Sequence, residues 1–478
     1  MARKSALSTT TATATAPPTH TLILDHGAHT FKASLVADNP SDPPSDPLCH
    51  LISNTLARSA RDHRTYIGAE LLRDCADYGA LAFRRPVEKG YVVNWEGEKA
   101  IWEHSLLGSL STASAPAAAA AAATKTATGT PADPGTTFAP LRTDPAVTTL
   151  LWTEAPGAPA ALQRNADEMV FEEFGFAAAW RAMGTPEELT TPAAPIWSAY
   201  APASTPATAS PPECLLVVDI GHSHSTATPL LHGRPLHPAC RRLDVGGRTL
   251  TNRLRDVLSR TVVVQHEDWL VQEIKEDVCY VSSDFAADLT RAWRGGQRDP
   301  RPRDPSIVVD YVLPDYETTL RGFARPPGVP SSTATPAAPR REHVISLANE
   351  RFTVPELLFT PSDVGMPQDG LAGTVLQSVH ALPPAARPAF LANILVVGGG
   401  ARLPGLLPRL HAELRPRVDE ELPVRLALAH DPVRHAWRGG LRVARDPDAR
   451  RAVVVSREEY WEHGEGWTRR RFAGMAGR

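Results

Sequence analysis

The sequence has few cysteines and no long apolar run. Its five cysteines are scattered, odd in number and include no Cys-x-x-Cys pair, which argues against a zinc knuckle and against a disulfide framework. Scattered thiols are typical of a reducing compartment such as the cytosol or the nucleus. No apolar run approaches the roughly 18 residues that a membrane-spanning helix needs. The N-terminal stretch has no apolar core, so we expect neither a membrane anchor nor a secretory signal.

A large excess of one charge is also missing. The formal net charge is −3 and the isoelectric point is about 6.6. A basic nucleic-acid footprint over the whole chain is therefore excluded, although a local patch is not. The basic run in WTRRRFAGMAGR, near the end of the sequence, has two interpretations. Either it contacts nucleic-acid phosphates or serves as an import signal, or it is a solvated tail.

Proline, alanine and threonine are abundant and gather in biased stretches. The 478 residues include 45 prolines, and 42% of all residues are hydrophobic. That length allows two or three average domains, or one bilobed fold with insertions. We predict a disordered tail over 1–18 and disordered insertions over 109–140, 185–212 and about 325–341, because such segments bury little apolar surface. We interpret them as spacers, with partner docking as the alternative.

Two segments repeat one pattern. DHGAHTFKASLV begins at Asp25 and DIGHSHSTATPL begins at Asp219. In each segment, an apolar run leads into an aspartate, which is followed by a glycine two positions on, a polar turn and a returning strand. A repeat of this kind indicates a duplicated, two-lobed architecture. A third glycine turn, Gly398–Gly400, lies between a predicted strand and a predicted helix in ILVVGGGARLPGLLPRLHAEL.

These three turns suit nucleotide binding. An aspartate at a strand end, followed by a tight glycine turn, can hold a hydrated divalent cation while backbone N–H groups face phosphates. Two such hairpins facing each other would clamp a nucleotide, and the third turn would let its base and sugar approach the backbone. The alternative is that Asp25 and Asp219 only cap their own turns. Their paired context favours positions in a cleft.

Further segments carry a more specific likeness. With the three turns, they make the chain similar to the actin family, within the wider group that includes sugar kinases and heat-shock chaperone ATPases. The likeness covers most of the chain outside the tail and the insertions. It implies an α/β, actin-like bilobed ATPase fold made of duplicated ribonuclease-H-like lobes, with low-complexity insertions. The segments are Pro86–Trp102 (PVEKGYVVNWEGEKAIW), Trp152–Pro156 (WTEAP), Asp244–Leu254 (DVGGRTLTNRL), Ile274–Phe285 (IKEDVCYVSSDF) and Asn349–Phe359 (NERFTVPELLF).

The resemblance also implies domain boundaries. The first lobe would span 19–213 and the second lobe 214–430. A reduced subdomain 2 would occupy 49–85 of the first lobe, and subdomain 4 would occupy 245–365 of the second. The last segment, 431–478, would return to the first lobe. In the secondary structure we also expect a helix over Gly247–Leu258 and helices near Ala166–Phe174 and Ala177–Met183, among others.

Nine residues match the nucleotide-binding positions of the actin family. The match implies ATP or ADP with a divalent cation as the cofactor, although the residues alone make no cofactor certain. Lys275 and Glu276 would contact the adenine and ribose; alternatively they are an exposed charged pair on a helix. The nine residues are Asp25, Gly27 and Lys32 in the first turn, Asp219 and Gly221 in the second, Lys275 and Glu276 on a helix, and Gly398 and Gly399 in the third turn.

The two phosphate turns depart from the actin pattern. His26, Ala28 and His29 stand where actin has small residues that leave room for phosphates. His222 replaces the second turn's second aspartate, and His224 replaces an aliphatic residue. We interpret these histidines as filling the space of a phosphate tail. A zinc site is the alternative, but we expect no metal site.

A group that positions the attacking water is missing as well. The segment FAAAWRAMGT, in which the actin family places a water-positioning glutamine, has none near Gly184. Activation of water needs a polar group within hydrogen-bond reach. Because two candidates are absent, we predict no significant ATP hydrolysis and assign no catalytic residue.

Filament contacts are reduced too. Between Cys49 and Tyr66 the chain is too short for actin's long subdomain-2 loop, which inserts into the next subunit of a filament. The insertions over 109–140 and 185–212 would further obstruct packing. Without that loop a head-to-tail assembly lacks a main contact, so we expect no self-polymerisation.

A narrower resemblance lies within the family. Val309–Asp315 (VDYVLPD), Leu347–Gly370 and the run WEGEKAIWE are most similar to the family of nuclear actin-related protein 6. That implies a subunit of a Swr-type chromatin remodeling complex, which exchanges a variant histone into nucleosomes using a separate motor ATPase. The implied partners are a helical insert of the motor subunit and a small zinc-finger subunit, with nucleosome or DNA contact inside the complex. The implied location is the nucleus, with the cytoplasm as an additional one.

Other functions stay open at this point. The chain could be a nucleotide-binding switch or a weak ATPase of the actin family in another nuclear or cytoskeletal complex. A sugar kinase would need a catalytic aspartate near the second phosphate turn. The actin-like segments IKEDVCYV and NERF argue against a sugar kinase.

Overall fold

The computed structural model describes most of the chain outside the biased segments. The predicted tail up to residue 17, the insertion over 185–212 and most of the other two insertions lie outside the described residues. The described ranges are 18–37, 47–107, 136–183, 213–329 and 342–472, apart from positions 76, 80, 263, 265, 266, 296–298, 303, 317 and 318.

The first lobe is built on a seven-stranded sheet with the order β21-β11-β10-β1-β2-β3-β9. Strand β1 pairs with β10 in parallel and with β2 in antiparallel fashion. Its leucines are fully buried because helices cover both faces of the sheet, which is why it is apolar without interruption. The strands are β1 (His20–His26), β2 (Thr30–Ala37), β3 (Cys49–Ser53), β9 (Thr136–Thr137), β10 (Thr148–Glu154), β11 (Ala178–Met183) and β21 (Val455–Ser456).

The helix expected near Ala177–Met183 was wrong, because this segment is strand β11. It pairs in parallel with β10 and antiparallel with β21. Three consecutive alanines favour a helix locally, but the segment is buried between two strands, and such packing overrides intrinsic preference. The other expected helix is present as α4 (Ala160–Glu168), which continues as a π-helix over Met169–Glu173.

The insertion predicted over 109–140 ends earlier than expected, and the insertion predicted over about 325–341 begins later. Residues 136–140 are ordered, since β9 pairs with β3 and Phe138 is buried. Residues 325–329 are ordered as well: β17 (Phe323–Arg325) pairs with β16 (Val309–Val312), and the Gly328 N–H donates to Asp310 Oδ2 at 2.9 Å. One buried aromatic and one buried carboxylate are enough to fix these ends.

The second lobe repeats the plan of the first. Strands β12 and β13 form the same kind of hairpin as β1 and β2, and β12 pairs in parallel with β19 as β1 does with β10. The duplication predicted from the two hairpins is therefore confirmed, and so is the actin-like bilobed α/β fold. The strands are β12 (Cys214–Ile220), β13 (Ser225–Leu231), β14 (Arg234–Pro235), β15 (Arg241–Leu243), β19 (Ile394–Val397) and β20 (Leu426–Leu428).

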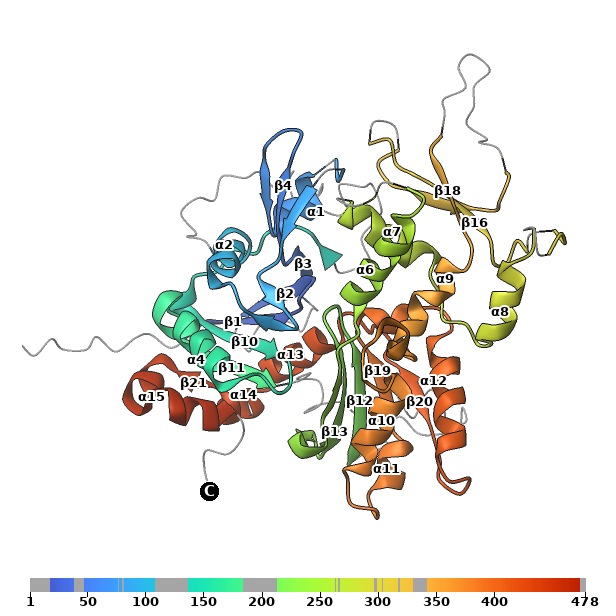
Figure 1. Ribbon diagram of the computed structural model, residues 1–478. Helices are drawn as coiled ribbons and strands as arrows, with labels where there is room; N and C mark the ends of the chain where they lie inside the picture. The colour runs from blue at the N-terminus through green and yellow to red at the C-terminus, as the bar shows by residue number, and fades with distance from the viewer. Residues whose placement is uncertain are drawn as a thin grey trace, which may run out of the picture.

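Helices pack against this second sheet and bury one continuous core. Figure 1 shows the orange helices beside the green strands of the sheet. Among the described helices, none is both long and apolar enough to span a membrane. The helices of this lobe are α6 (Gly247–Leu258), α7 (Asp268–Val278), α8 (Phe285–Ala292), α9 (Glu350–Thr353), α10 (Leu371–His380), α11 (Arg387–Leu391) and α12 (Leu406–Leu414).

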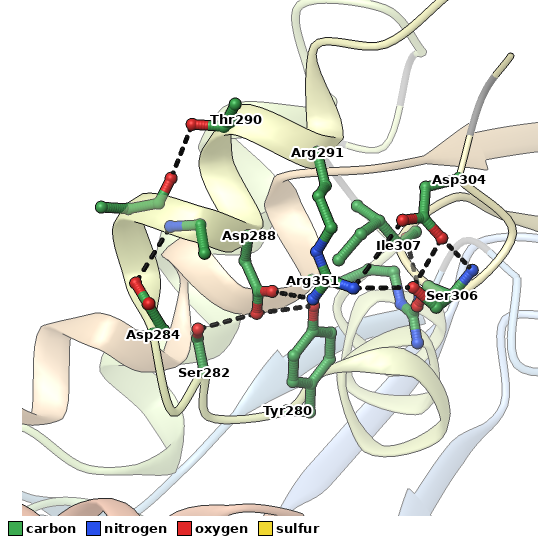
Figure 2. Close-up of polar contacts among 12 residues, drawn as sticks. Tyr280, Ser282, Asp284, Asp288, Thr290, Arg291, Asp304, Ser306, Ile307 and Arg351 are labelled. Carbon is green, nitrogen blue, oxygen red and sulfur yellow. Dashed lines mark hydrogen bonds and ion pairs between the residues drawn. The ribbon is translucent and has the colours of Figure 1, made fainter. Parts of the chain in front are cut away.

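A polar network fixes α8 to its surroundings (Figure 2). The Asp288 carboxylate accepts hydrogen bonds from Ser282 Oγ at 2.7 Å and Tyr280 OH at 3.3 Å, and it also pairs with Arg291. Close by, the Arg351 guanidinium donates to the backbone carbonyls of Val278, Ser306 and Ile307. The network ties α8 and the loop at 304–307 to the end of α7.

A small subdomain sits on each lobe, and the two face each other across the upper part of the molecule (Figure 1). On the first lobe, β4 (Leu56–Ser59), β5 (Thr65–Ile67), α1 (Ala69–Asp74) and β6 (Leu81–Arg84) enclose their own apolar cluster. On the second lobe, β16, β17 and β18 (Val344–Leu347) form a three-stranded sheet beside α7. The remaining elements before α4 are β7 (Val87–Glu88), β8 (Tyr91–Val92) and α2 (Trp95–Ser105).

The C-terminal segment packs on the first lobe. Its helices, red in Figure 1, lie next to the first sheet, and β21 completes the edge of that sheet. Trp437 and Leu441 of the first of these helices are buried in the core of this lobe. The helices are α13 (His435–Arg445), α14 (Pro447–Val453) and α15 (Arg457–Phe472).

Candidate functional site

A cavity of about 800 Å³ lies between the lobes. Both hairpin turns, the start of α6, one side of α7 and the third glycine turn contribute to its wall. All nine residues singled out in the sequence line it, so the fold brings together positions that are almost 375 residues apart in the chain. They are Asp25, Gly27, Lys32, Asp219, Gly221, Lys275, Glu276, Gly398 and Gly399.

The first turn holds its aspartate by local contacts. Lys32 Nζ lies 3.3 Å from Asp25 Oδ2, and Thr153 Oγ1 donates to Asp25 Oδ1 at 3.1 Å. Gly27 is needed here because a Cβ would come within 2.4 Å of the Thr30 carbonyl oxygen. Both carboxylate oxygens of Asp25 therefore already have partners within the first lobe.

The second turn packs against the third. Gly398 adopts φ 89°, and a Cβ there would lie 2.3 Å from Asp219 Oδ1, so only glycine fits. Burial and the nearby Asp25 carboxylate raise the pKa of Asp219 to about 6, although Lys32 and His435 oppose the shift. The N–H groups of Gly247 and Arg248 donate to the carbonyls of Gly221 and His222, which attaches the start of α6 to the turn.

Two histidine rings meet in the middle of the cleft. His29 of the first turn stacks on His222 of the second, with ring centroids 4.8 Å apart and an interplanar angle of 27°. Burial lowers the pKa of both rings well below the usual range, and the positive charges of Arg85 and Lys275 lower it further. Both imidazoles are thus neutral at pH 7. Within the described chain, His29 Nδ1 and His222 Nε2 are buried and have no hydrogen-bond partner.

A third histidine reaches the first lobe beside this pair. A Cβ at Gly90 would lie 2.4 Å from His224 Cε1, so the ring packs directly on the turn between β7 and β8. Burial, with Arg242 nearby, lowers the pKa of His224 to about 4.

The fourth histidine does not join them, which corrects the expectation that His26 stands in the phosphate space. His26 Nε2 lies 2.6 Å from Glu98 Oε1, which also accepts a hydrogen bond from Trp102 Nε1 at 2.8 Å. Neighbouring residues of a strand point to opposite faces, so His26 turns into the first-lobe core when Asp25 faces the cleft. Among the residues that the structure describes, no group of three or more histidine, cysteine or acidic side chains could hold a metal ion.

The predicted base-contacting pair lies on α7. Lys275 is buried, and its ammonium group donates to Gly247 O at 3.2 Å, Thr251 Oγ1 at 2.9 Å and Gln272 Oε1 at 2.8 Å. These contacts use all three donors of the amine, so it joins α7 to α6. Glu276 is exposed and accepts a hydrogen bond from Gln272.

Some cleft residues were missed in the sequence. Thr153 holds Asp25, Arg85 sets the charge around the histidine pair, and Gly90 makes room for His224. All three lie within or next to the quoted actin-like segments, and that was their only signal. The position expected for the water-positioning glutamine, near Gly184, lies outside the described residues, so that prediction stays a prediction.

The residues present do not fit a cation-bound polyphosphate between the two turns. Two rings with centroids 4.8 Å apart leave no space for a phosphate group between them. The Asp25 carboxylate, which would order the waters around a cation, is engaged by Lys32 on one oxygen and by Thr153 on the other. Gly398–Gly400 and the cleft side of α7 line the same cavity as the stacked rings.

Comparisons with known proteins give the family of the chain. The sequence profile described as Actin matches residues 16–473. Actin-like protein arp6 of Emericella nidulans is 42% identical, over 96% of this chain and 95% of its own length. Actin-related protein 6 of Neurospora crassa is 41% identical, over 97% of this chain and 96% of its own length. Actin-related protein 6 of Drosophila melanogaster is 32% identical, over 93% of this chain and 97% of its own length. The chain therefore belongs to the actin family, as one of its actin-related proteins.

Proposed function

We propose that the protein is a non-polymerising structural and interaction subunit of a Swr-type chromatin remodeling complex. In that complex a separate motor ATPase drives exchange of a variant histone into nucleosomes. The proposal is supported by the likeness to relatives named actin-related protein 6, which extends over nearly the full length of both chains. The sequence segments VDYVLPD and WEGEKAIWE, which resemble actin-related protein 6 more specifically than actin in general, support the same assignment.

The observation that carries the proposal is the composition of the two cleft turns. ATP hydrolysis needs a cation held between the turns and a polar group that positions the attacking water. In this chain the turns present neutral imidazoles to each other, and Asp25 is held by Lys32 and Thr153. We infer that the cleft does not hydrolyse ATP and that the fold acts as a scaffold.

The short hairpin of subdomain 2 supports a subunit that does not form filaments. Strands β4 and β5 are joined by residues 60–64 only, and the Ser59 N–H closes the turn on the Arg64 carbonyl at 2.9 Å. Asp62 Oδ1 also accepts from the Arg64 N–H at 3.1 Å. This compact turn is too short to reach into a neighbouring subunit, whereas head-to-tail assembly depends on such a contact.

The partners follow from the proposed complex. We propose a helical insert of the motor subunit and a small zinc-finger subunit as direct partners, with nucleosome or DNA contact inside the assembly. The proposed location is the nucleus, with the cytoplasm in addition. The basic end of the chain falls partly on α15 and partly outside the described residues, so its role stays a prediction.

A tagged purification from native nuclear extract at moderate salt tests the assignment. We expect a Swr-type motor, its ring-forming helicases and histones among the co-purifying chains. If the protein emerges alone or with cytoskeletal proteins, the complex assignment is wrong and only the family remains. A parallel single-turnover assay with radiolabelled ATP is expected to show no cleavage, and measurable cleavage would contradict the scaffold function.

A further inference from the structure

The stacked histidines lie where a bound nucleotide would connect the lobes. His29 comes from the β1–β2 turn of the first lobe, and His222 comes from the β12–β13 turn of the second. In two facing hairpins of this kind, the backbone N–H groups of both turns point at a shared anion. Here a ring from each turn occupies that place, so the chain supplies its own contact.

The backbone on both sides of the pair is fixed. In the first lobe the Asn54 N–H donates to the His29 carbonyl at 2.9 Å, and Asn54 Nδ2 donates to the Gly27 carbonyl at 3.2 Å. In the second lobe the Arg248 N–H donates to the His222 carbonyl at 2.7 Å. The backbone that carries each ring is therefore held by its own lobe, independently of the stacking contact.

Other contacts join the lobes beside and above the pair. Arg242 of β15 donates to the Lys89 carbonyl at 2.8 Å and to Tyr91 OH at 3.2 Å, and its guanidinium also lies over the Tyr91 ring. Higher up, Tyr78 of subdomain 2 stacks on Trp269 of α7, with centroids 4.3 Å apart and an interplanar angle of 16°. The side chains of this protein thus connect the lobes at three levels.

The charges around the ring pair determine when it can form. Arg85 precedes β7, Arg248 and Lys275 lie on α6 and α7, and Lys32 lies on β2; all of them are cationic and act on one or both rings. Four carboxylates line the cleft. Asp25 is neutralised by Lys32, and Asp219 packs on Gly398. Glu154 pairs with Arg181, and Glu276 accepts a hydrogen bond from Gln272. A proton added to either imidazole would place a new positive charge among existing ones.

We propose that the His29–His222 pair replaces the nucleotide as the link between the lobes, so that cleft closure needs neither nucleotide nor divalent cation and is released by acid. This rests on the proposed scaffold function and specifies how the scaffold is held shut. A rigid cleft suits a subunit whose partners bind one fixed shape, because pre-organised surfaces lose less entropy on association.

Hydrogen exchange of the full chain, in peptides covering 24–33 and 218–226, tests the proposal. The wild type is compared with His29→Phe/His222→Phe, which keeps stacked rings but cannot titrate, and with His29→Ser/His222→Ser, which has no rings. A double variant of two exposed helix histidines, His380→Phe/His411→Phe, is the matched control. Each protein is measured with EDTA and with Mg·ATP, at pH 7.5 and at pH 5.5.

At pH 7.5 we expect the wild type and the Phe pair to be protected equally, with less than about twofold change between EDTA and Mg·ATP. At pH 5.5 the wild type and the control should lose protection in both peptides, whereas the Phe pair should keep it. The Ser pair should exchange at least about tenfold faster at pH 7.5. If the Ser pair does not fold, the comparison of the wild type with the Phe pair still tests whether the histidine rings hold the cleft closed.

Three results would overturn the inference. They are protection of the wild type only with Mg·ATP, equal loss of protection at pH 5.5 in the wild type and the Phe pair, or a folded Ser pair that is as protected as the wild type. These failures differ from failure of the proposed function. A wild type that needs Mg·ATP can still co-purify with the remodeler, and a self-closed cleft can exist in a chain that does not.

Discussion

Two clusters of polar side chains differ in how completely their buried polar atoms are hydrogen-bonded. On the outer side of the second lobe, the Asp288 carboxylate receives donors from Ser282 and Tyr280, and every contact in Figure 2 links a donor to an acceptor. In the cleft, one ring nitrogen each of His29 and His222 is buried and has no hydrogen-bond partner among the residues that the structure describes. Buried polar groups are paired in most native structures, so the cleft cluster departs from the rule.

The difference separates a role in stability from a role in position. A buried polar atom without a partner costs about 1–3 kcal/mol, so these two ring nitrogens do not add to the stability of the fold. The Asp288 network holds α8 in place, and any well-paired set of side chains could do that. The His29–His222 contact joins two turns across the cleft, although one nitrogen of each ring has no partner within the described chain.

Acid should affect the cleft cluster most. The folded chain keeps both rings neutral because burial lowers their pKa, whereas in the unfolded chain a histidine takes up a proton below about pH 6.5. The unfolded state therefore binds more protons, and stability falls as pH falls below 6.5. Between pH 6.5 and pH 5 each ring should contribute a loss of up to about 2 kcal/mol.

Urea unfolding of the wild type and of His29→Phe/His222→Phe at several pH values measures this loss as a difference. The raised pKa values of Asp219 and Glu273 act in the opposite direction, since those groups bind protons more tightly in the folded chain. They are common to both proteins and cancel in the comparison. Equal pH dependence of the two proteins would show that the rings are not held neutral.

Removal of the Asp288 carboxylate tests the other cluster. Asp288→Ala should lower the free energy of unfolding by about 3 kcal/mol, because the hydroxyls of Ser282 and Tyr280 lose their acceptor in a buried place. Asp284→Ala, which removes only the N-cap of α8, should cost about 1 kcal/mol. Denaturation at pH 7.5 compares the two, and equal costs would mean that the network adds nothing to the cap.

The sequence predicted those parts of the molecule that depend on local chemistry. The Asp-x-Gly turns at Asp25 and Asp219 and the glycines at 398–400 can be recognised without long-range information, and all of them line the cavity. The helix α6 was predicted with the bounds that it has in the structure. Turn residues and amphipathic periods report on their immediate neighbours, which is why these predictions were confirmed.

What depends on distant partners was not predicted. Strand β11 is set by pairing with β10 and with β21, which lies more than 270 residues further along the chain. The stack of His29 on His222 and the approach of Arg85 to both rings are likewise tertiary. The direction of the His26 side chain could have been predicted, because the alternation of side chains along a strand places it on the face opposite Asp25.

A methyl group at Gly90 should disturb the contact between His224 and the first lobe. Gly90→Ala combines a positive φ of 86° with a Cβ only 2.4 Å from His224 Cε1, and we expect a loss of about 2 kcal/mol. Gly157→Ala is the matched control, since Gly157 has a similar φ of 76° and open space around its Cβ position. It should cost only about 1 kcal/mol of backbone strain.

The double variant Gly90→Ala/His224→Ala separates the clash from the strain. Removal of the ring should recover the excess of Gly90→Ala over Gly157→Ala, when all variants are measured by urea unfolding at pH 7.5. Additive costs would place the His224 ring elsewhere and would remove one of the contacts between the lobes.

The smallest effect should come from the aromatic stack between the subdomains. Tyr78→Leu and Trp269→Leu remove the two rings singly and together, and their coupling energy isolates the stack from the hydrogen bond that Tyr78 OH donates to the Leu71 carbonyl. We expect a coupling of about 1 kcal/mol. Tyr460→Leu with Trp269→Leu is the control, because Tyr460 packs on Phe171 in the first-lobe core. Its coupling should be zero. A coupling at Tyr78 no larger than this control would mean that the subdomains touch without stabilising each other. The lobes would then be joined by the histidine pair, by Arg242 and by the packing of His224 on the Gly90 turn.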